Sequence, residues 1–273
     1  GITFRQVRVM EIVLIKAYTE KPWRSHDTYQ LIENSLKEKW GVHSINTKDS
    51  LTLFSFIRNL QSEHRNKLFV FNIAEYLDEK NKAGFLPALL EEMDVAHFGS
   101  SSEAIENGLD KAETKRLLLE NGVPTPKYFV VDNQMSDTSS AAKRIGFPLI
   151  VKPIREGGHI GIREDSIVYD DIGLNMITNR ILDEHNQPAL VEEFITGKRM
   201  REFSVGIIDG KTRLFTPIEI DYKAMGVKEK ILSYEAAQSD LEQTKLVKKG
   251  KIHEEIISLA EKTFDIIGAN DYS

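Results

Sequence analysis

The stretch VKPIREGGHIGI, from Val151 to Ile162, follows an apolar run and places Lys152 at the end of a strand, before a turn that contains three glycines. Such a layout points one ammonium group and several backbone N–H groups at the same space, where together they stabilise the dispersed charge of a phosphate. It differs from a Walker A loop and from a GxGxxG dinucleotide turn. The stretch therefore predicts either a phosphate clamp or an ordinary turn in which glycine supplies positive φ.

Composition restricts the classes of partner. The 273-residue chain carries 36 basic and 42 acidic side chains, and its basic residues form no separate stripe, which argues against nucleic-acid binding. It has no apolar run of the roughly 18 residues that a membrane span requires and no signal-peptide layout, so we expect a cytoplasmic protein without a membrane partner. Because cysteine is absent, any metal must be held by oxygen or imidazole ligands.

The first part of the chain alternates strand and helix. An apolar strand is expected from Glu11 to Ile15, and a helix carries its apolar residues from Tyr29 to Trp40 before Gly41 ends it. A second helix around Leu53 to Leu60 precedes a buried strand from Lys67 to Ile73. This order predicts a small α/β domain with a parallel sheet.

Two further groups of elements follow. Asp110 with Glu113 predicts a capping box that opens a helix, and Gly122 and Pro124 end it. The next elements predict an α+β domain: strands Lys127–Val131, Pro148–Lys152 and Ile167–Tyr169, with a helix at Asp137–Ile145.

The last part predicts an antiparallel sheet, because Asp209-Gly210 between two strands is a strong hairpin signal. A mobile loop is expected at Tyr222–Gln243, ahead of a final helix. The expected strands and helix are Ala189–Ile195, Glu202–Ile208, Thr212–Ile220 and Ile252–Ile267.

Several charged side chains admit two interpretations each. Glu192 and Glu193 must face opposite sides of their strand, so one could contact a ligand, although a solvated edge is the more common arrangement. Lys111 lies in the first turn of its helix, where the dipole disfavours a cation unless an anion is near. His159 has no histidine partner at metal-ligand spacing, which favours a turn residue. The lysines after the hairpin favour a solvated lid, with phosphate contacts as the alternative interpretation; they are Lys223, Lys228 and Lys230.

Six blocks of sequence occur in a recognisable order: Phe71–Glu75, Pro87–Glu91, Leu109–Lys115, Gly122–Pro126, Val151–Ile162 and Leu190–Gly197. In this order they resemble the D-alanine-D-alanine ligase branch of the ATP-grasp superfamily. The similarity covers about Leu68 to Glu219, and the order is far more specific than any single block.

The resemblance implies an α/β fold in which an N-terminal parallel-sheet domain precedes a two-part ATP-grasp of α+β type. The expected domains are 1–97, 98–189 and 190–273, with ATP gripped between the last two. In such ligases the γ-phosphate of ATP passes to a carboxylate, and an amine attacks the resulting acyl phosphate. Positioning and charge neutralisation are the main tasks of a protein that transfers phosphoryl groups.

The resemblance also implies roles for individual residues. Lys111 and Lys152 would contact the ATP phosphates, and the loop from Glu156 to Gly161 would close over them. Glu202 would hold the ribose hydroxyls, and Lys230 would reach the γ-phosphate. The catalytic residues expected on this basis are Lys230, Gly158 and His159; the remaining loop contacts are Glu156, Gly157 and Gly161, and the strand that receives adenine contributes Glu192, Glu193, Phe194 and Ile195.

Three departures from the family pattern bear on the substrate and the metal. Gly158-His159 stands where the family usually carries a serine pair. Near the N-terminus, where D-alanine-adding ligases carry an acid for the substrate ammonium, only Glu20 or Asp27 is available. The sequence stops at Ser273, before the family's Arg-x-Asp strand and Glu-x-Asn segment, so the resemblance implies a truncated C-terminal part and Mg²⁺ ligands beyond Ser273.

The sequence therefore predicts an ATP-dependent carboxylate-amine ligase that joins two amino acids, with ATP and Mg²⁺ as cofactors. Relatives imply a homodimer and a place in peptidoglycan synthesis. Three alternatives stay open: a ligase for a different acid and amine, a nucleotide-binding module without catalysis, and a plain α/β structural domain, which would treat the ordered blocks as accident.

Overall fold

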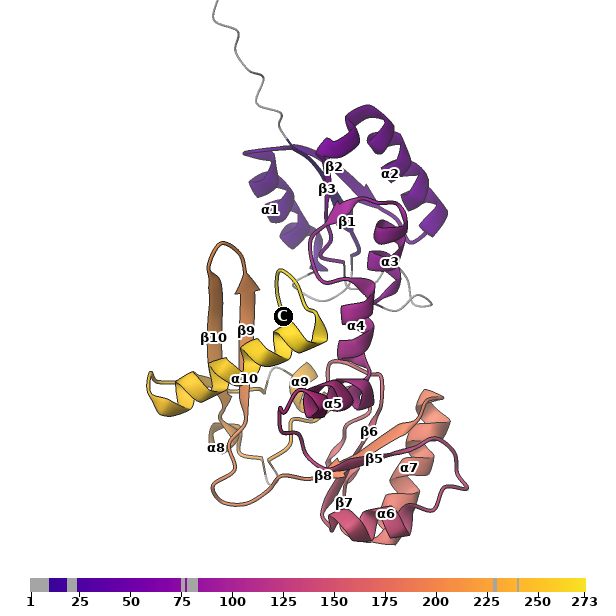
Figure 1. Cartoon of the computed structure of the whole chain (residues 1–273), viewed down its shortest axis with the longest axis vertical. Coiled ribbons are helices and arrows are strands. Elements are labelled where there is room, and N and C mark those ends of the chain that lie inside the picture. The colour runs from indigo at the N-terminus through magenta and orange to yellow at the C-terminus, as the bar shows by residue number, and fades with distance from the viewer. Residues whose placement is uncertain (1–9, 19–23, 75–76, 78–82, 228–229, 240) are drawn as a thin grey trace, which may run out of the picture. The chain divides into compact units, whose positions relative to one another are not determined.

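The computed structural model describes residues 10–18, 24–74, 77, 83–227, 230–239 and 241–273. The chain divides into two compact units (Figure 1). Unit 1 comprises Gly1–Glu106 with Gly268–Tyr272, and unit 2 comprises Asn107–Ile267 with Ser273. Glu20, Glu75 and Lys228, which the sequence analysis singled out, lie outside the described residues.

Unit 1 is built on a parallel sheet, as the sequence predicts. Its strands follow the order β2-β1-β3-β4, and α1 and α2 cover its two faces (Figure 1). Ile12 packs against Tyr29 of α1, whereas Val13 packs against Leu53 of α2. The elements are β1 (Glu11–Lys16), α1 (His26–Lys37), β2 (Gly41–Asn46), α2 (Ser50–His64), a 3-10 turn (Arg65–Lys67), β3 (Leu68–Phe71), α3 (Phe85–Glu92) and β4 (Ala96–His97).

Two strands of this sheet and one boundary were not predicted. β2 is an edge strand whose residues are half-buried or exposed, so it lacks the apolar alternation of a strand packed on one face. β4 is only two residues long. The first helix ends at Lys37, and the expected extension to Trp40 was wrong because Glu38 caps the helix.

Unit 2 contains an antiparallel sheet of order β5-β8-β6-β7. All of its strands were predicted, within two residues at each end. The core lies between this sheet and two helices. The elements are β5 (Tyr128–Val131), α6 (Thr138–Ile145), β6 (Leu149–Pro153), a 3-10 turn (Glu164–Ser166), β7 (Ile167–Val168), α7 (Asp171–His185) and β8 (Ala189–Glu193).

The sequence analysis missed α7, the longest helix packed on this sheet. Leu174, Ile177 and Ile181 are fully buried on one side of it, but Ile172 and Met176 are exposed on the other. Apolar residues on both sides hide the helical period. The shorter helix α4 (Ser102–Leu109) was also missed.

The predicted cap of α5 (Lys111–Glu120) is half formed. The Asp110 carboxylate accepts a hydrogen bond from the Glu113 backbone N–H at 3.0 Å, which satisfies one free donor of the first turn. The Glu113 carboxylate binds Arg116 instead of turning back to residue 110. The expected helix is therefore confirmed, with an N-cap in place of a reciprocal capping box.

A second antiparallel sheet, of order β11-β10-β9, completes unit 2 and confirms the predicted hairpin. The segment Tyr222–Gln243, expected to be a mobile loop, instead holds two short helices, capped by Asp221 and Ser233. Ile231 and Leu232, which lie between the two helices in the sequence, are buried. The elements are β9 (Phe203–Asp209), β10 (Arg213–Ile220), α8 (Tyr222–Met225), α9 (Tyr234–Gln238), β11 (Thr244–Leu246) and α10 (Lys251–Ile267).

No helix within the described ranges is long and apolar enough to cross a membrane.

The two faces of α7 give a matched test of this core. We expect Ile177→Ala to lower the free energy of unfolding of unit 2 by about 2–5 kcal/mol, because it leaves a cavity against β6 and β8. Ile172→Ala, on the exposed side of the same helix, should change it by less than about 0.5 kcal/mol. Urea unfolding followed by circular dichroism measures both; equal effects would contradict the assignment of the buried face.

Candidate nucleotide-binding site

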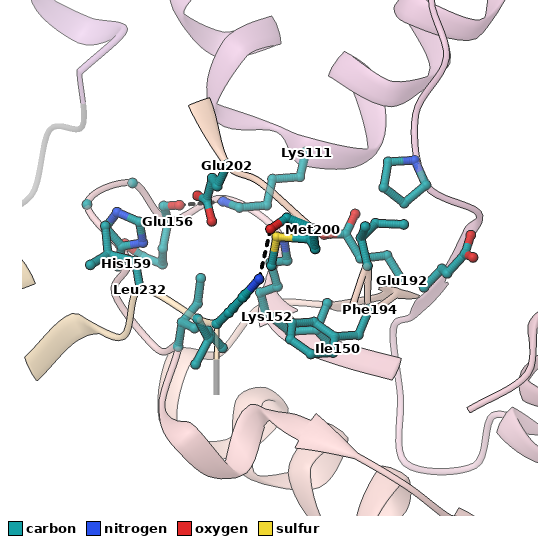
Figure 2. Close-up of a pocket in the computed structure, with 18 of the residues that line it drawn as sticks. Lys111, Ile150, Lys152, Glu156, His159, Glu192, Phe194, Met200, Glu202 and Leu232 are labelled. Atoms are coloured by element: carbon teal, nitrogen blue, oxygen red, sulfur yellow. Dashed lines mark hydrogen bonds and ion pairs between the residues drawn. The ribbon is translucent and has the colours of Figure 1, made fainter. Parts of the chain in front are cut away.

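Unit 2 contains a cavity of 670 Å³ at the ends of β6 and β8. Figure 2 shows charged side chains and apolar side chains around it. The helix α5, the glycine-rich turn after β6 and the segments 193–202 and 230–232 supply the rest of its wall. The lining residues are Gly108, Leu109, Lys111, Pro126, Ile150, Lys152, Glu156, Gly157, Gly158, His159, Ile162, Glu192, Glu193, Phe194, Ile195, Met200, Arg201, Glu202, Lys230, Ile231 and Leu232.

The wall of the cavity contains a buried carboxylate held by two ammonium groups. Glu192, on β8, is only 6% exposed. One of its oxygens pairs with Lys152 on the neighbouring strand β6, and the other lies 2.6 Å from Nζ of Lys115 on α5. Lys115 also donates to the Thr125 hydroxyl at 2.8 Å and to the Pro126 carbonyl at 3.1 Å. Three elements are thus tied together at one carboxylate.

A third lysine lies close to this group. Lys111 is the first residue of α5, and its ammonium donates to the backbone carbonyl of Glu156 in the glycine-rich turn. Its backbone N–H donates to the Ile154 carbonyl at 3.0 Å, so the start of the helix is joined to the end of β6. The carboxylate of Glu156 accepts from Gln187 at 2.9 Å.

Burial and charge shift the pKa values of these groups. Burial lowers the pKa of Lys111, and the neighbouring charge of Lys152 lowers it further. Burial likewise lowers the pKa of Lys115, against the attraction of Glu192. Burial alone would raise the pKa of Glu192, but Lys152 and Lys115 outweigh it, so this pKa lies below its ordinary value. Three ammonium groups thus lie around the single buried carboxylate of Glu192, and the next acid that acts on Lys111 is Glu156.

The turn after β6 has an unusual backbone. Gly158, His159 and Gly161 all have positive φ, at 59°, 61° and 79°. A Cβ atom at Gly161 would lie 2.4 Å from Cγ of Pro153, whereas one at Gly157 or Gly158 would meet no described atom within 4 Å. Gly161 is therefore required for packing, and the first two glycines border open space. His159 holds a left-handed conformation that costs a non-glycine residue energy.

A neighbouring part of the cavity wall is apolar. Ile150 and Ile231 are buried there and pack with Ile162 and Phe194. The N–H groups of Glu193 and Phe194 donate to the carbonyls of Lys127 and Pro148, at 2.9 and 3.1 Å. These two positions therefore offer carbonyl oxygens, not N–H groups, to a ligand.

Two further charged groups lie at the rim. Glu202 accepts a hydrogen bond from the Tyr222 hydroxyl, and burial, followed by this hydrogen bond, raises the pKa of that tyrosine. Lys230 donates to the carbonyl of Met200 at 2.9 Å and more weakly to those of Gly197 and Lys198.

The structure brings together all of the sequence-predicted site residues except Gly161, which does not line the cavity. Sequence reasoning missed the role of Lys115. A signal existed, because Lys115 follows Lys111 by four residues and so shares its face of α5.

Comparison with known proteins identifies the family. The family described as D-ala D-ala ligase C-terminus matches residues 117–273. The chain belongs to the D-alanine–D-alanine ligase family. This confirms the resemblance drawn from the ordered sequence blocks.

Sequence similarity to two relatives covers more of the chain than the family model does, and it reaches into unit 1. A protein of Sinorhizobium fredii, called uncharacterized protein y4sG, is 27% identical over 215 residues, which cover 77% of this chain and 60% of that protein. A D-alanine–D-alanine ligase of Pediococcus pentosaceus is 28% identical over 250 residues, covering 89% of this chain and 65% of that protein. The chain thus spans less than two thirds of the length of either.

A solved structure shares the fold. The D-alanine–D-alanine ligase from Bacillus anthracis complexed with ATP superimposes with a TM-score of 0.69 at 18% identity, covering 97% of this chain and 80% of that one. The ATP-grasp fold expected for this family member is confirmed.

The carboxylate between the lysines gives a test that depends on pH. We expect Glu192→Gln to lower the free energy of unfolding by about 3–5 kcal/mol at neutral pH, because it leaves buried ammonium groups uncompensated. Since the pKa of Glu192 is lowered in the folded protein, its stabilisation is complete above the unfolded value of 4.5 and is lost as pH falls through the lower folded value. The difference between wild type and variant should therefore shrink below pH 4.5 in urea titrations.

Glu120→Gln is the matched control, because Glu120 forms an exposed ion pair with Arg116 on the same helix that supplies Lys115. Such a pair contributes about 0–1 kcal/mol. Equal destabilisation by the two variants would contradict the central place given to Glu192.

Proposed function

We propose that this chain binds ATP in the cavity of unit 2 and belongs to an ATP-dependent ligase that joins two amino acids through an acyl phosphate. One observation carries the proposal: two lysines pair with a buried carboxylate at a polar wall, a third binds the adjacent glycine-rich turn, and an apolar region lies in the same cavity. That division fits a ligand with a polyanionic end and a flat apolar end.

Lys111 and Lys152 would bind the phosphates. Lys152 pairs with Glu192 in the structure described here, and its move to a phosphate would leave Glu192 paired with Lys115. The carboxylate thus keeps one partner throughout, which avoids the cost of an isolated buried charge. Lys115 is a positioning residue in this proposal.

The apolar region would receive adenine, against Ile150, Phe194 and Ile231. Carbonyl oxygens of the segment from Glu192 to Ile195 would accept from the adenine amino group, since its N–H groups at 193 and 194 are already used. Glu202, at the rim, would accept from the ribose hydroxyls.

The turn from Glu156 to Gly161 would close over the phosphates, with Gly157, Gly158 and His159 facing them. Lys230 would exchange its carbonyl partners for the γ-phosphate. A carboxylate oxygen of the first amino acid attacks the γ-phosphorus and ADP leaves; the amine of the second then attacks the acyl carbon, and inorganic phosphate leaves. Stabilisation of the transferred charge by the lysines is the protein's main contribution.

We include Mg²⁺ as a cofactor in this proposal because the family resemblance implies it. Across the residues that the structure describes, the one group of three or more acidic or imidazole ligands close enough for a metal lies in unit 1. Among the described residues that line the cavity of unit 2, no group of three such ligands is present.

Several further features follow from the family. The amino-acid substrates would be D-alanine, the product would serve peptidoglycan synthesis in the cytoplasm, and the enzyme would act as a homodimer. The domains would be 1–97, 98–189 and 190–273.

Nucleotide binding is tested by calorimetric titration of ATP into the chain. Lys152→Met should weaken ATP binding about 10–100-fold, because it removes one charge-assisted contact of about 1.5–3 kcal/mol. Lys143→Met, which removes an exposed lysine on α6, is the control and should bind as the wild type does. Unchanged affinity in the Lys152 variant, with an unaltered circular dichroism spectrum, would contradict the phosphate role.

Turnover is tested by ADP release in the presence of Mg²⁺, with D-alanine and a panel of other amino acids, on a form extended past Ser273. Release with D-alanine supports the proposed substrate. ADP release only with other amino acids would show that the substrate is not D-alanine, although the ligase activity would hold. ATP binding without ADP release for any amino acid would identify a nucleotide-binding module.

A further inference from the structure

A second group of functional side chains lies in unit 1, where the proposed function assigns none. Nε2 of His43 is 2.9 Å from Oε2 of Glu11, and the rings of His43 and His64 have centroids 5.2 Å apart. One ligand atom from each of the three residues lies within 4.8 Å of the other two. All three side chains are partly buried.

The fold brings these residues together from three elements. Glu11 opens β1 opposite Gly41, so His43, two residues later on parallel β2, shares the face of Glu11 and Val13. That face is the one covered by α2, because Val13 packs with Leu53. α2 leaves the carboxyl end of β2 and returns to the amino end of β3, which puts its last residue, His64, at the amino edge of the sheet.

His64 carries an unexplained buried nitrogen. Its Nε2 is fully shielded from solvent and has no hydrogen-bond partner within the described part of the chain. The nearest carboxylate oxygen on its own helix, that of Glu63, is 3.6 Å away, too far for a hydrogen bond. A shielded imidazole nitrogen normally finds a partner, because leaving it unpaired costs about 1–3 kcal/mol.

Two local features favour a cation here. A Cβ atom at Gly41 would lie 2.0 Å from Oε2 of Glu11, so the absence of a side chain at residue 41 makes room for the carboxylate. His64 is also the last residue of α2, before a 3-10 turn, and the helix dipole gives this end a partial negative charge.

We propose that Glu11, His43 and His64 form a binding site for a divalent transition-metal ion of the zinc class. Two imidazoles and one carboxylate are a common protein ligand set for Zn²⁺, with water completing the tetrahedron. Ligand atoms bonded at about 2.0–2.1 Å to one tetrahedral ion lie roughly 3.4 Å apart, a spacing that side-chain rotation reaches from the present arrangement. The ion would join β1, β2 and the end of α2, and so stabilise unit 1. Hard Mg²⁺, which prefers oxygen ligands, would not compete.

The test is titration of ZnCl₂ into the chelator-stripped 273-residue chain by calorimetry, with Co²⁺ absorption as a second readout of coordination. We expect one ion per chain, and a melting temperature that rises with Zn²⁺ because the folded state binds it. Glu11→Gln and His64→Gln should each weaken binding by at least about tenfold, since even outer-shell substitutions cost about 10–100-fold.

Gly41→Ala provides a variant that keeps every ligand. Its new methyl group would displace the Glu11 carboxylate and should also weaken Zn²⁺ binding, without a change in circular dichroism. His253→Gln, on α10 of unit 2, is the matched control and should bind Zn²⁺ as the wild type does. The proposal is overturned if the wild type binds no Zn²⁺, or if Glu11→Gln, His64→Gln and Gly41→Ala all bind it with unchanged affinity. ATP binding is measured separately, so the absence of Zn²⁺ binding would contradict the metal site without contradicting the proposed nucleotide site.

Discussion

The cavity of unit 2 depends on one buried ion cluster, the Glu192 carboxylate between Lys115 and Lys152. A carboxylate in this position is tolerable only because both of its oxygens have cationic partners, and those partners come from α5 and β6. The cluster therefore fixes the register of the helix against the sheet at the place where a ligand would meet them. The surrounding apolar residues supply volume and burial, but they do not define which side chains face the cavity.

The parts of this arrangement that are local in sequence could be predicted. Lys152 at a strand end and the glycines after it identify the polar wall, and Asp209-Gly210 identifies the hairpin. Lys115 could not be assigned in the same way, because its contact with Glu192 spans 77 residues and depends on how α5 packs. The spacing of four residues from Lys111 places both lysines on one face of α5, but it does not identify Glu192 as the partner.

Sequence reasoning missed some elements for physical reasons. β2 lies at a sheet edge, and neither of its faces is continuously apolar, because His43 interrupts one face and Ser44 the other. α7 exposes Ile172 and Met176, so its apolar residues surround the helix. In the segment 222–243, the many charged residues predicted a loop, although a few side chains, such as that of Ile231, are buried. In each case tertiary burial, not the local period, decides the structure.

The contact between Gly161 and Pro153 gives the glycine-rich turn two unequal ends. At Gly161 the chain rests against a rigid proline ring, and no side chain larger than hydrogen fits. At Gly157 and Gly158 there is free space around the backbone. The turn is thus closely packed at its far end and has space around its backbone at its near end. Substitution should accordingly be asymmetric along it: Gly157 has neither a positive φ nor a close neighbour and can vary, whereas Gly161 has both and cannot.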